Sequence, residues 1–360
     1  MDKQLPKYTI VADWLKQNIK NNTFKVGDKL ISENQICDKF DVSRQTARQA
    51  VAVLEREGLV VKRQGSGTYV NGLTAKPQHK NIGILTTYIG DYIFPGLISG
   101  IQDVLSHHDY QMTLRLTQNK IKNERRQLQS LLSLDIDGLI VEATKSALPS
   151  PNIDIYQEFI RRSIPIVFVH AFPPGLSCNY IINDDEKGGR LAARHLIESG
   201  HKKIGGIFKF DDIQGNLRYK GVVVEMYAHG ITLDENAIIW YSTETHDHLF
   251  DKDFLPRTMA RLAGCTALIC YNDEIAVNAL QSFEREGLHV PDDISVVSFD
   301  NSNLAKIAQP MLTSITHPGS DLGKMATESL LDIIQNPYYE IKHVFDPQLI
   351  VRNSVKKLKQ

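Results

Sequence analysis

The sequence predicts an α/β protein in which a small N-terminal winged helix-turn-helix precedes a larger region of parallel sheets. Three observations support this class. The 360 residues exceed what one hydrophobic core usually holds. Three helical patterns and two β-branched runs fill the chain before Asn71. From Asn81 onward, short apolar runs alternate with helical stretches, as in βαβ units. That region is too long for one compact sheet, so we expect two similar lobes.

The N-terminal segment contains three stretches with helical spacing: YTIVADWLKQNI, ENQICDKF and SRQTARQAVAVLEREG. In the third stretch Ser43 is a suitable N-cap and Gly58 follows the last turn. Its apolar face carries Ala47, Ala50, Val51 and Leu54. The runs LVVKR and TYV then predict a hairpin. Helix, tight turn, helix and hairpin follow one another in the order of a winged helix-turn-helix.

The stretch from Asn71 to Lys80 is polar and lacks apolar periodicity, so it predicts a linker. We therefore expect a DNA-binding domain at 1–72, a linker at 73–80 and an effector-binding and dimerisation domain at 81–360. In the last region the predicted strands are IGILTT, MTLRL, GLIVEA, IPIVFVH, KIGGIFK, TALICY, DISVVSF and LTSITH.

Charge is distributed unevenly between these regions. Residues 1–72 hold 12 Lys and Arg against 8 Asp and Glu, whereas the remainder holds 29 against 34. Only the first segment therefore suits a polyanion such as DNA. No apolar run is long enough to cross a bilayer and no signal segment begins the chain, so we expect a cytoplasmic protein.

Motifs for catalysis or metal binding are missing from the sequence. The four cysteines form no CxxC pair, and HExxH, EF-hand, GxSxG and Walker patterns do not occur. We therefore expect no catalytic residue, no metal site and no cofactor.

The third helix has the side chains needed to read DNA. Gln45, Arg48 and Gln49 lie opposite its apolar face, with Arg44 at the border. A helix that enters the major groove reads bases through such long donors. A merely solvated face is the alternative for any isolated helix, but here a second helix, a turn, a basic balance and a hairpin accompany it.

The hairpin tip reads RQGSGTYV, with Gln64, Gly65, Ser66 and Gly67 at its centre. A phosphate-binding loop is excluded because the spacing fits neither the Walker nor the dinucleotide pattern. A plain turn and the tip of a DNA-binding wing remain, and both use glycines that permit positive φ.

In the second region, polar and aromatic residues follow the predicted strands. Ligands of open α/β sheets bind at these carboxyl ends, and the mixture suits a polyhydroxylated molecule. Helix capping is the alternative use, above all for Asp273. The residues are Thr86, Thr87, Tyr88, Glu142, His170, Lys209, Tyr271, Asn272, Asp273, Phe299 and Asp300.

The first segment resembles the GntR-type winged-helix domain in three stretches: LPKY, VGDKLISENQICDKFDVSRQTARQAVAVLEREGLV and RQGSGTYV. The resemblance implies that Arg44, Thr46 and Arg48 contact bases or phosphates. It also implies that Lys7 contacts the DNA backbone, and that Gln64 with Gly65 reaches the minor groove.

From Asn81 to about Ser354 the chain resembles the effector domain of the LacI/GalR repressors, relatives of periplasmic sugar-binding proteins. The resemblance rests on NDDEKGGRLAARHLIESGHKKIGGI, ALICYNDEIAVNALQSFEREGLHVPDDISVVSFDN and LTSITHPGSDLGKMATESLL. It implies a homodimer and a sugar held between two lobes joined by three crossovers. One lobe would span about 81–182 and 317–343, and the other about 183–316 and 344–360. Arg218, Asn272 and Asp300 would bind the sugar, and His170 stands where some members carry aspartate.

A GntR-type head joined to a LacI-type effector domain resembles the arabinose-responsive repressors of Firmicutes. This implies a repressor that binds operator DNA as a dimer, is released by the inducer L-arabinose and controls arabinose utilisation and transport genes. Tyr88, Tyr92, Phe94, Glu142 and Lys209 would be further sugar contacts. Two alternatives stay open: a ligand that acts as corepressor, and a sugar-modifying enzyme that uses Glu142, Asp273 and Asp300 as acid and base.

Overall fold

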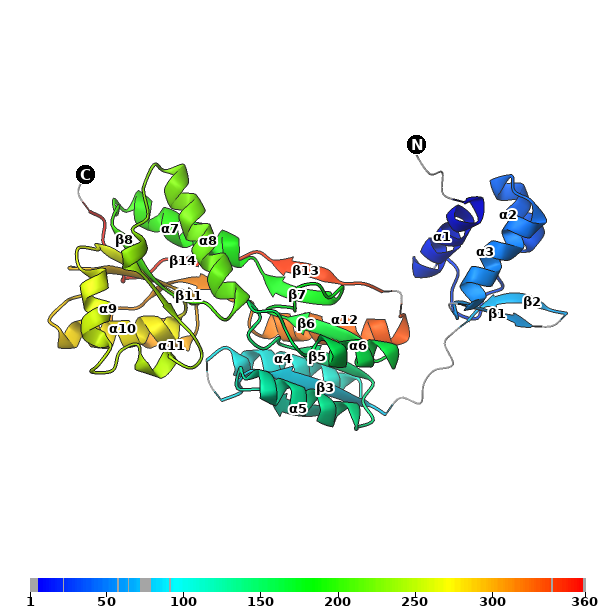
Figure 1. The fold of residues 1–360 in the computed structure, drawn as a ribbon, viewed down its shortest axis with the longest axis horizontal. Helices are drawn as coiled ribbons and strands as arrows, with labels where there is room; N and C mark the ends of the chain where they lie inside the picture. The colour runs from blue at the N-terminus through cyan, green and yellow to red at the C-terminus, as the bar shows by residue number, and fades with distance from the viewer. Residues whose placement is uncertain are drawn as a thin grey trace. The chain divides into compact units, whose positions relative to one another are not determined.

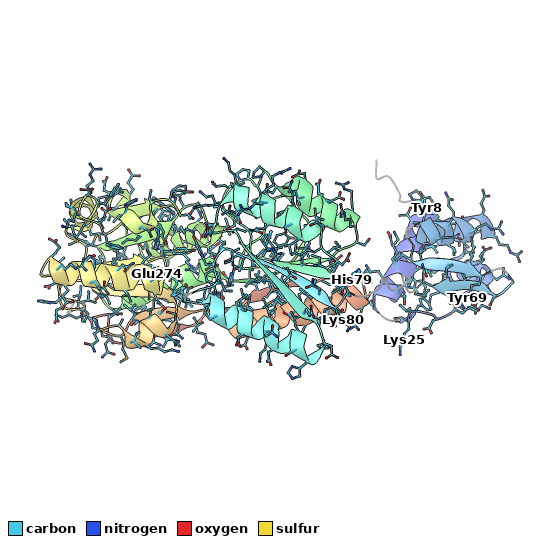
Figure 2. The ribbon with its side chains drawn as sticks, turned by 90° about the horizontal axis from the view of Figure 1, so that it is seen from below. Tyr8, Lys25, Tyr69, His79, Lys80 and Glu274 are labelled. Atoms are coloured by element: carbon cyan, nitrogen blue, oxygen red, sulfur yellow. The ribbon has the colours of Figure 1, made fainter. Side chains whose placement is uncertain are left out.

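A computed structural model describes residues 6–21, 23–56, 58–63, 65–71, 79–90, 92–337 and 339–358. Its contacts divide the chain into two compact units (Figure 1). The first comprises Met1–His79 and Asn336–Tyr339, and the second comprises Lys80–Gln335 and Glu340–Gln360. Tyr8, Lys25 and Tyr69 belong to the first unit, and Lys80 and Glu274 to the second (Figure 2).

In its described residues, the first unit has three helices and one hairpin, as the sequence predicts. Its elements are α1 (Lys7–Lys20), α2 (Glu33–Phe40), α3 (Arg44–Arg56), β1 (Val60–Arg63) and β2 (Gly67–Val70). A capping box between Ser32 and Gln35 starts α2, and the left-handed Asp41 (φ 48°) ends it. Ser43 then accepts a hydrogen bond from the N–H of Thr46 at 3.2 Å, so the predicted N-cap of α3 is confirmed.

Apolar residues of all these elements form one core. The predicted face of α3, Ala47, Ala50, Val51 and Leu54, is buried against Val11, Leu15 and Ile36 from the other helices. Leu59, Val60 and Val70 attach the hairpin to the same core. The described part of this unit therefore has a hydrophobic core of its own.

The second unit contains two six-stranded sheets. The first sheet has the order β13-β7-β6-β5-β3-β4 and is parallel throughout. Its strands are β3 (Asn81–Thr86), β4 (Gln111–Leu116), β5 (Gly138–Val141), β6 (Ile166–Val169), β7 (Asn179–Asn183) and β13 (Lys342–Phe345). Its helices are α4 (Phe94–His107), α5 (Ile121–Leu132), α6 (Ile153–Arg161) and α12 (Ser320–Gln335). We call this the N-lobe.

The second sheet has the order β14-β12-β11-β10-β8-β9, and only the short β14 runs antiparallel. Its strands are β8 (Ile204–Lys209), β9 (Ile238–Tyr241), β10 (Ala267–Cys270), β11 (Ser295–Asp300), β12 (Thr313–Thr316) and β14 (Leu349–Ile350). Its helices are α7 (Asp185–Glu198), α8 (Ile213–Ala228), α9 (Leu255–Leu262), α10 (Asp273–Arg285) and α11 (Asn303–Ile307). We call this the C-lobe.

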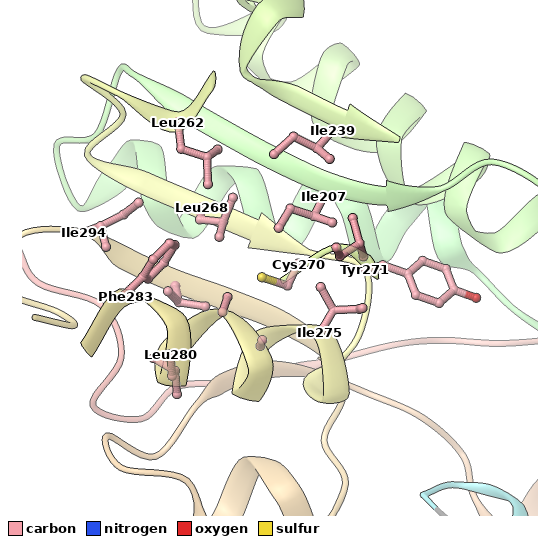
Figure 3. Close-up of a cluster of buried hydrophobic side chains, with 14 of the residues drawn as sticks. Ile207, Ile239, Leu262, Leu268, Cys270, Tyr271, Ile275, Leu280, Phe283 and Ile294 are labelled. Atoms are coloured by element: carbon pink, nitrogen blue, oxygen red, sulfur yellow. The ribbon is translucent and has the colours of Figure 1, made fainter. Parts of the chain in front are cut away.

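Helices cover both faces of the C-lobe sheet because successive strand residues point in opposite directions. Along β10, Leu268 and Cys270 pack against the layer that contains α9 and α10 (Figure 3). Ala267 and Ile269 pack instead against the layer that contains α7 and α8. This two-sided burial explains the continuous apolar runs in the sequence.

The chain crosses between the two sheets three times, after β7, after β12 and after β13. Four of the strands joined by these crossovers, β7, β13, β12 and β14, lie at one end of each sheet order, whereas β8, which follows β7 through α7, lies next to the other edge. The edge strands β4 and β9 lie at the other end. We call the region between the two lobes, at the carboxyl ends of their strands, the cleft. Its side at β7, β12, β13 and β14 is called the hinge side, and its side at the edge strands β4 and β9 is called the mouth.

Candidate functional site

The outer face of α3 presents the predicted DNA-reading residues. Arg44, Gln45, Arg48 and Gln49 are exposed. An Arg48 Nη2 lies 3.5 Å from Oε2 of Glu33 on α2, an exposed ion pair of little energetic weight. The hydroxyl of Thr46 is 2.9 Å from that of Ser43, so it is partly engaged in the cap. Lys7 is exposed at the first residue of α1.

The wing tip is a tight turn with two left-handed glycines. Gly65 has φ 74° and Gly67 has φ 123°. A Cβ at Gly67 would lie 2.6 Å from Cε of Lys29, so the end of this flexible side chain would have to shift, and the positive φ itself favours glycine. The exposed Ser66 hydroxyl is 2.6 Å from the hydroxyl of Tyr69. Gln64 lies outside the described residues.

In the second unit, Arg218 is the centre of the candidate ligand site. It is 2% exposed, yet its guanidinium donates to Asp185 (2.8 Å), to the Tyr271 carbonyl (2.6 Å) and to Asp300 (3.1 Å). The rings of Tyr271 and Phe299 pack on it, with centroids 4.9 and 4.5 Å from Cζ. Burial opposes its charge, but the two carboxylates raise the pKa of Arg218 above its ordinary value.

Glycines allow α7 and α8 to approach closely enough to hold this arginine. A Cβ at Gly189 would lie 2.1 Å from the carbonyl oxygen of Arg218, and one at Gly221 would lie 2.0 Å from that of Glu186. Asp185 opens α7 and Arg218 lies on α8, so the close helix pair sets the distance between them.

Glu142, directly after β5, accepts hydrogen bonds on both carboxylate oxygens. Oε2 accepts from the Thr86 hydroxyl (2.9 Å) and from the N–H (2.8 Å) and hydroxyl (2.5 Å) of Thr87, and Oε1 lies 3.0 Å from Nδ1 of His170. Burial alone would raise the pKa of Glu142, but the bonds from His170 and Thr87 lower it to about 2. Glu142 is therefore a fixed carboxylate on the N-lobe side of the cleft.

His170 is joined to His317, a residue at the β12–α12 crossover that the sequence analysis missed. Their Nε2 atoms are 3.0 Å apart, and Nδ1 of His317 accepts from the N–H of Gly319 at 3.0 Å. With Nδ1 of His317 as an acceptor, its Nε2 donates to Nε2 of His170, and Nδ1 of His170 donates to Glu142. Burial lowers the pKa of His317 well below its ordinary value, and His170 and Arg218 act in the same direction.

Asn272 and Asp273 hold the start of α10. Asn272 caps this helix through a bond from the N–H of Ile275 (2.9 Å). The carboxylate of Asp273 accepts from the hydroxyls of Ser298 (2.5 Å) and Ser314 (2.7 Å) and from the N–H of Ser302 (2.7 Å). Asp273 is fully buried, so the arrangement favours the structural use over direct ligand contact for this residue.

Tyr92, in the loop before α4, reaches across the cleft. Its hydroxyl donates to Oδ2 of Asp300 at 2.6 Å and accepts from the N–H of Asp273 at 3.0 Å. Burial, with the nearby Asp300 and Asp273, raises the pKa of Tyr92 well above its ordinary value. Tyr92 therefore connects the lobes as a neutral phenol.

Lys209, Tyr88 and Phe94 complete the predicted set. Lys209 is buried at the end of β8, with Nζ 2.5 Å from Oδ2 of Asp212. Burial opposes its charge, but Asp212 and Asp211 raise the pKa of Lys209. The ring of Tyr88 packs edge-on to Phe94 at 5.9 Å, and Phe94 packs edge-on to His170 at 6.5 Å. These residues therefore belong to the cleft.

Backbone strain also gathers at this cleft. Tyr92, His170 and Asp300 have φ values of 80°, 63° and 90°, in the region that favours glycine. Such conformations persist only where the surroundings fix them, and they concentrate at binding sites.

Asp185 and Asp212 are two further site residues that the sequence analysis missed. Asp185 lies in the quoted NDDEKGG stretch, and Asp212 follows Lys209 by three positions. Because Arg218 and Lys209 each need a carboxylate partner when buried, a search of the sequence for such partners could have identified both aspartates. Within the described ranges, no group of three or more His, Cys, Asp or Glu could hold a metal ion, and no helix has the length and apolar character needed to span a membrane.

Comparisons with known proteins identify the family of each region. Residues 7–70 match the family model described as bacterial regulatory proteins, gntR family, and residues 193–355 match that of the periplasmic binding protein-like domain. Fold and sites therefore define a winged-helix transcription regulator with a LacI-type effector domain.

The relatives narrow this class. The Arabinose metabolism transcriptional repressor of Geobacillus stearothermophilus is 38% identical over 99% of this chain and 100% of that protein. The protein of the same name from Halalkalibacterium halodurans is 36% identical over 98% of this chain and 97% of that protein. The chain belongs to this family of arabinose metabolism transcriptional repressors. It is a sugar-responsive repressor and not an enzyme, so the alternative of a sugar-modifying enzyme is wrong.

A solved structure gives the same fold. The LacI family transcriptional regulator from Enterococcus faecium with bound ribose superimposes with a TM-score of 0.66 at 25% identity, covering 78% of this chain and 100% of that one. The predicted fold class and the predicted family are confirmed.

Proposed function

We propose that this protein is a cytoplasmic homodimer that binds operator DNA of arabinose utilisation and transport genes and releases it when L-arabinose binds the cleft. The observation that carries the proposal is the polar, aromatic cleft centred on Arg218, in a chain whose full-length relatives are named for arabinose metabolism.

The residue types suit a small sugar. Asp300 and Glu142 accept hydrogen bonds from hydroxyl groups, whereas Arg218 and Lys209 donate to them. The rings of Tyr88 and Phe94 offer apolar surface to the C–H faces of a pyranose. Contacts from both lobes favour closure, and closure changes the positions of the chains that lead to the DNA-binding heads.

The test begins with isothermal titration of the full-length protein with L-arabinose, D-arabinose, D-xylose, D-ribose and D-galactose. We expect L-arabinose to bind most tightly, and D-arabinose, its mirror image, serves as the matched control. A preference for another sugar would overturn the ligand assignment.

The same protein would select duplexes from a random DNA library, and the selected duplex would be titrated with and without L-arabinose. Loss of DNA affinity with the sugar supports an inducer, and a gain identifies a corepressor. Sedimentation equilibrium measures the mass of the complex, and a monomer on DNA contradicts the proposed dimer.

A further inference from the structure

The two lobes touch each other at the mouth of the cleft, on the side remote from the crossovers. The loops that follow β4 and β5 in the N-lobe meet the loops that follow β8 and β9 in the C-lobe. In each sheet order, β4 and β9 are the edge strands farthest from the hinge side. A contact between the loops that follow these strands therefore acts at the greatest distance from the crossovers if the two lobes rotate apart about them.

Asn119 is the centre of this contact. It is fully buried with φ 50°. Its Oδ1 accepts from the N–H of Lys145 at 2.7 Å inside the N-lobe. Its Nδ2 donates across the cleft to Oδ1 of Asp212 at 3.2 Å and to the hydroxyl of Thr243 at 2.6 Å. The oxygen of the Asn119 amide therefore bonds to its own lobe, whereas both N–H groups of this amide bond to the C-lobe.

Two neighbours of Asn119 strengthen the contact. The Lys145 ammonium lies 2.5 Å from Glu244 and 3.7 Å from Asp211, both in the C-lobe. The Ser146 hydroxyl accepts from the N–H of Ile213 at 3.0 Å. Ile213 is the first residue of α8, whose N–H has no partner within its own helix. The N-lobe therefore caps the helix that carries Arg218.

Asp212 connects this contact to the sugar cleft. Its Oδ1 accepts from Asn119, whereas its Oδ2 lies 2.5 Å from Nζ of Lys209. A single carboxylate is thus shared between the opposite lobe and a cation of the proposed sugar site.

We propose that Asn119, Lys145 and Ser146 form a latch against Asp211, Asp212, Thr243 and Glu244. Asn119 is its positioning residue, and the latch sets how readily the lobes close on the sugar. The proposal rests on the proposed function for the identity of the ligand. The latch stabilises the closed arrangement of the lobes. If the sugar binds only this arrangement, its apparent affinity falls as the closed fraction of the protein falls, so the latch changes sugar affinity without contacting the sugar.

The test compares Asn119→Asp with the matched control Asn123→Asp. In the first variant both donors are lost and a carboxylate faces Asp212, while the acceptor for Lys145 remains. Asn123 donates through Nδ2 to the Thr117 carbonyl at 2.9 Å, inside the N-lobe alone. Both variants lose the same group, but only one loses it between the lobes.

Amide hydrogen exchange, resolved to single residues, reports on the latch directly. In Asn119→Asp we expect the Ile213 amide to lose protection while the Lys145 amide keeps it. L-arabinose affinity should fall by roughly tenfold or more, because hydrogen bonds to a charged partner are among the stronger ones. Asn123→Asp should change neither measurement.

Two outcomes overturn the latch. If both the protection of the Ile213 amide and the sugar affinity are unchanged, the contact made by Asn119 does not contribute to the free energy of lobe closure. Loss of protection at both amides shows local unfolding instead of a positioning role. If the unmodified protein binds none of the five sugars, the proposed function is wrong. Hydrogen exchange at the Ile213 amide in Asn119→Asp then tests, by itself, whether the latch holds the two lobes together.

Discussion

At the scale of single residues, the cleft depends on a buried charge network centred on Arg218. Its guanidinium is matched by Asp185 and Asp300 and enclosed by the rings of Tyr271 and Phe299. A buried cation is stable only when it is paired, and here two carboxylates pair with one guanidinium. Removing either carboxylate would leave one ion pair and one guanidinium N–H without its acceptor. The same requirement fixes the positions of both acids and prepares the site for a neutral polyol.

Asp273 gives a prediction about pH. Burial, followed by the nearby Asp300, raises the pKa of Asp273 from 3.8 to about 6 although Ser298, Ser314 and Ser302 act against it. The folded protein therefore binds the proton more tightly than the unfolded chain, and this residue lowers stability as pH rises from about 4 to about 6. The pKa difference corresponds to about 3 kcal/mol.

Urea unfolding of the wild type and of Asp273→Asn at pH 4, 5, 6 and 7 measures this contribution. We expect the variant to be destabilised at every pH because its side chain offers one acceptor oxygen where the carboxyl group offers two. The difference in stability between the two proteins should narrow as pH rises, because only the wild type loses stability when Asp273 deprotonates. Parallel stability curves would contradict the raised pKa.

The sequence predicted the members of the cleft better than their roles. Polar residues after parallel strands must gather at one edge, so Glu142, Lys209 and Asp300 could be placed from the pattern alone. Asp273 shared that pattern, and only the three donors around it distinguish a helix anchor from a ligand contact. His317 lies in a crossover, and its pairing with His170 depends on how distant segments meet.

At the scale of elements, α3 allows sequence-specific DNA recognition to be distinguished from general affinity for DNA. We expect Arg48→Ala to cost about 1 to 3 kcal/mol on the selected duplex and to relax its sequence preference. Fluorescence anisotropy on selected and scrambled duplexes measures both quantities. An equal loss of affinity for the two duplexes would show that Arg48 contacts phosphates and does not read bases.

Glu33→Gln is the control for this experiment. It removes the 3.5 Å partner of Arg48 but leaves the arginine in place. If the intramolecular pair were the source of the effect, this variant would reproduce it. We expect it instead to retain the sequence preference.

Eight strands of the second unit were predicted, whereas β7, β9, β13 and β14 were missed. Three of these four are edge strands, and β14 has only two residues. Edge strands are covered on fewer sides, so KHVF in β13 alternates instead of forming an apolar run. The strand IIWY in β9 did carry an apolar signal that could have identified it.

At the scale of the whole molecule, sugar and DNA must affect each other equally. If L-arabinose weakens operator binding by some factor, saturating operator must weaken L-arabinose binding by the same factor. Couplings of this kind are typically about 1 to 3 kcal/mol. Titration of sugar into free protein and into the protein–duplex complex gives one factor, and DNA titrations give the other. A factor of one in both titrations would show that the sugar site and the DNA site are not coupled.

The order of segments also has a consequence for synthesis on the ribosome. The core of the winged head comes entirely from residues that precede Asn71, so this unit can fold while the rest is still being made. The N-lobe sheet needs β13, and the C-lobe sheet needs β14, so neither sheet is complete until the last residues emerge. A chain cut short during translation would therefore carry a folded DNA-binding module with no means of sensing sugar.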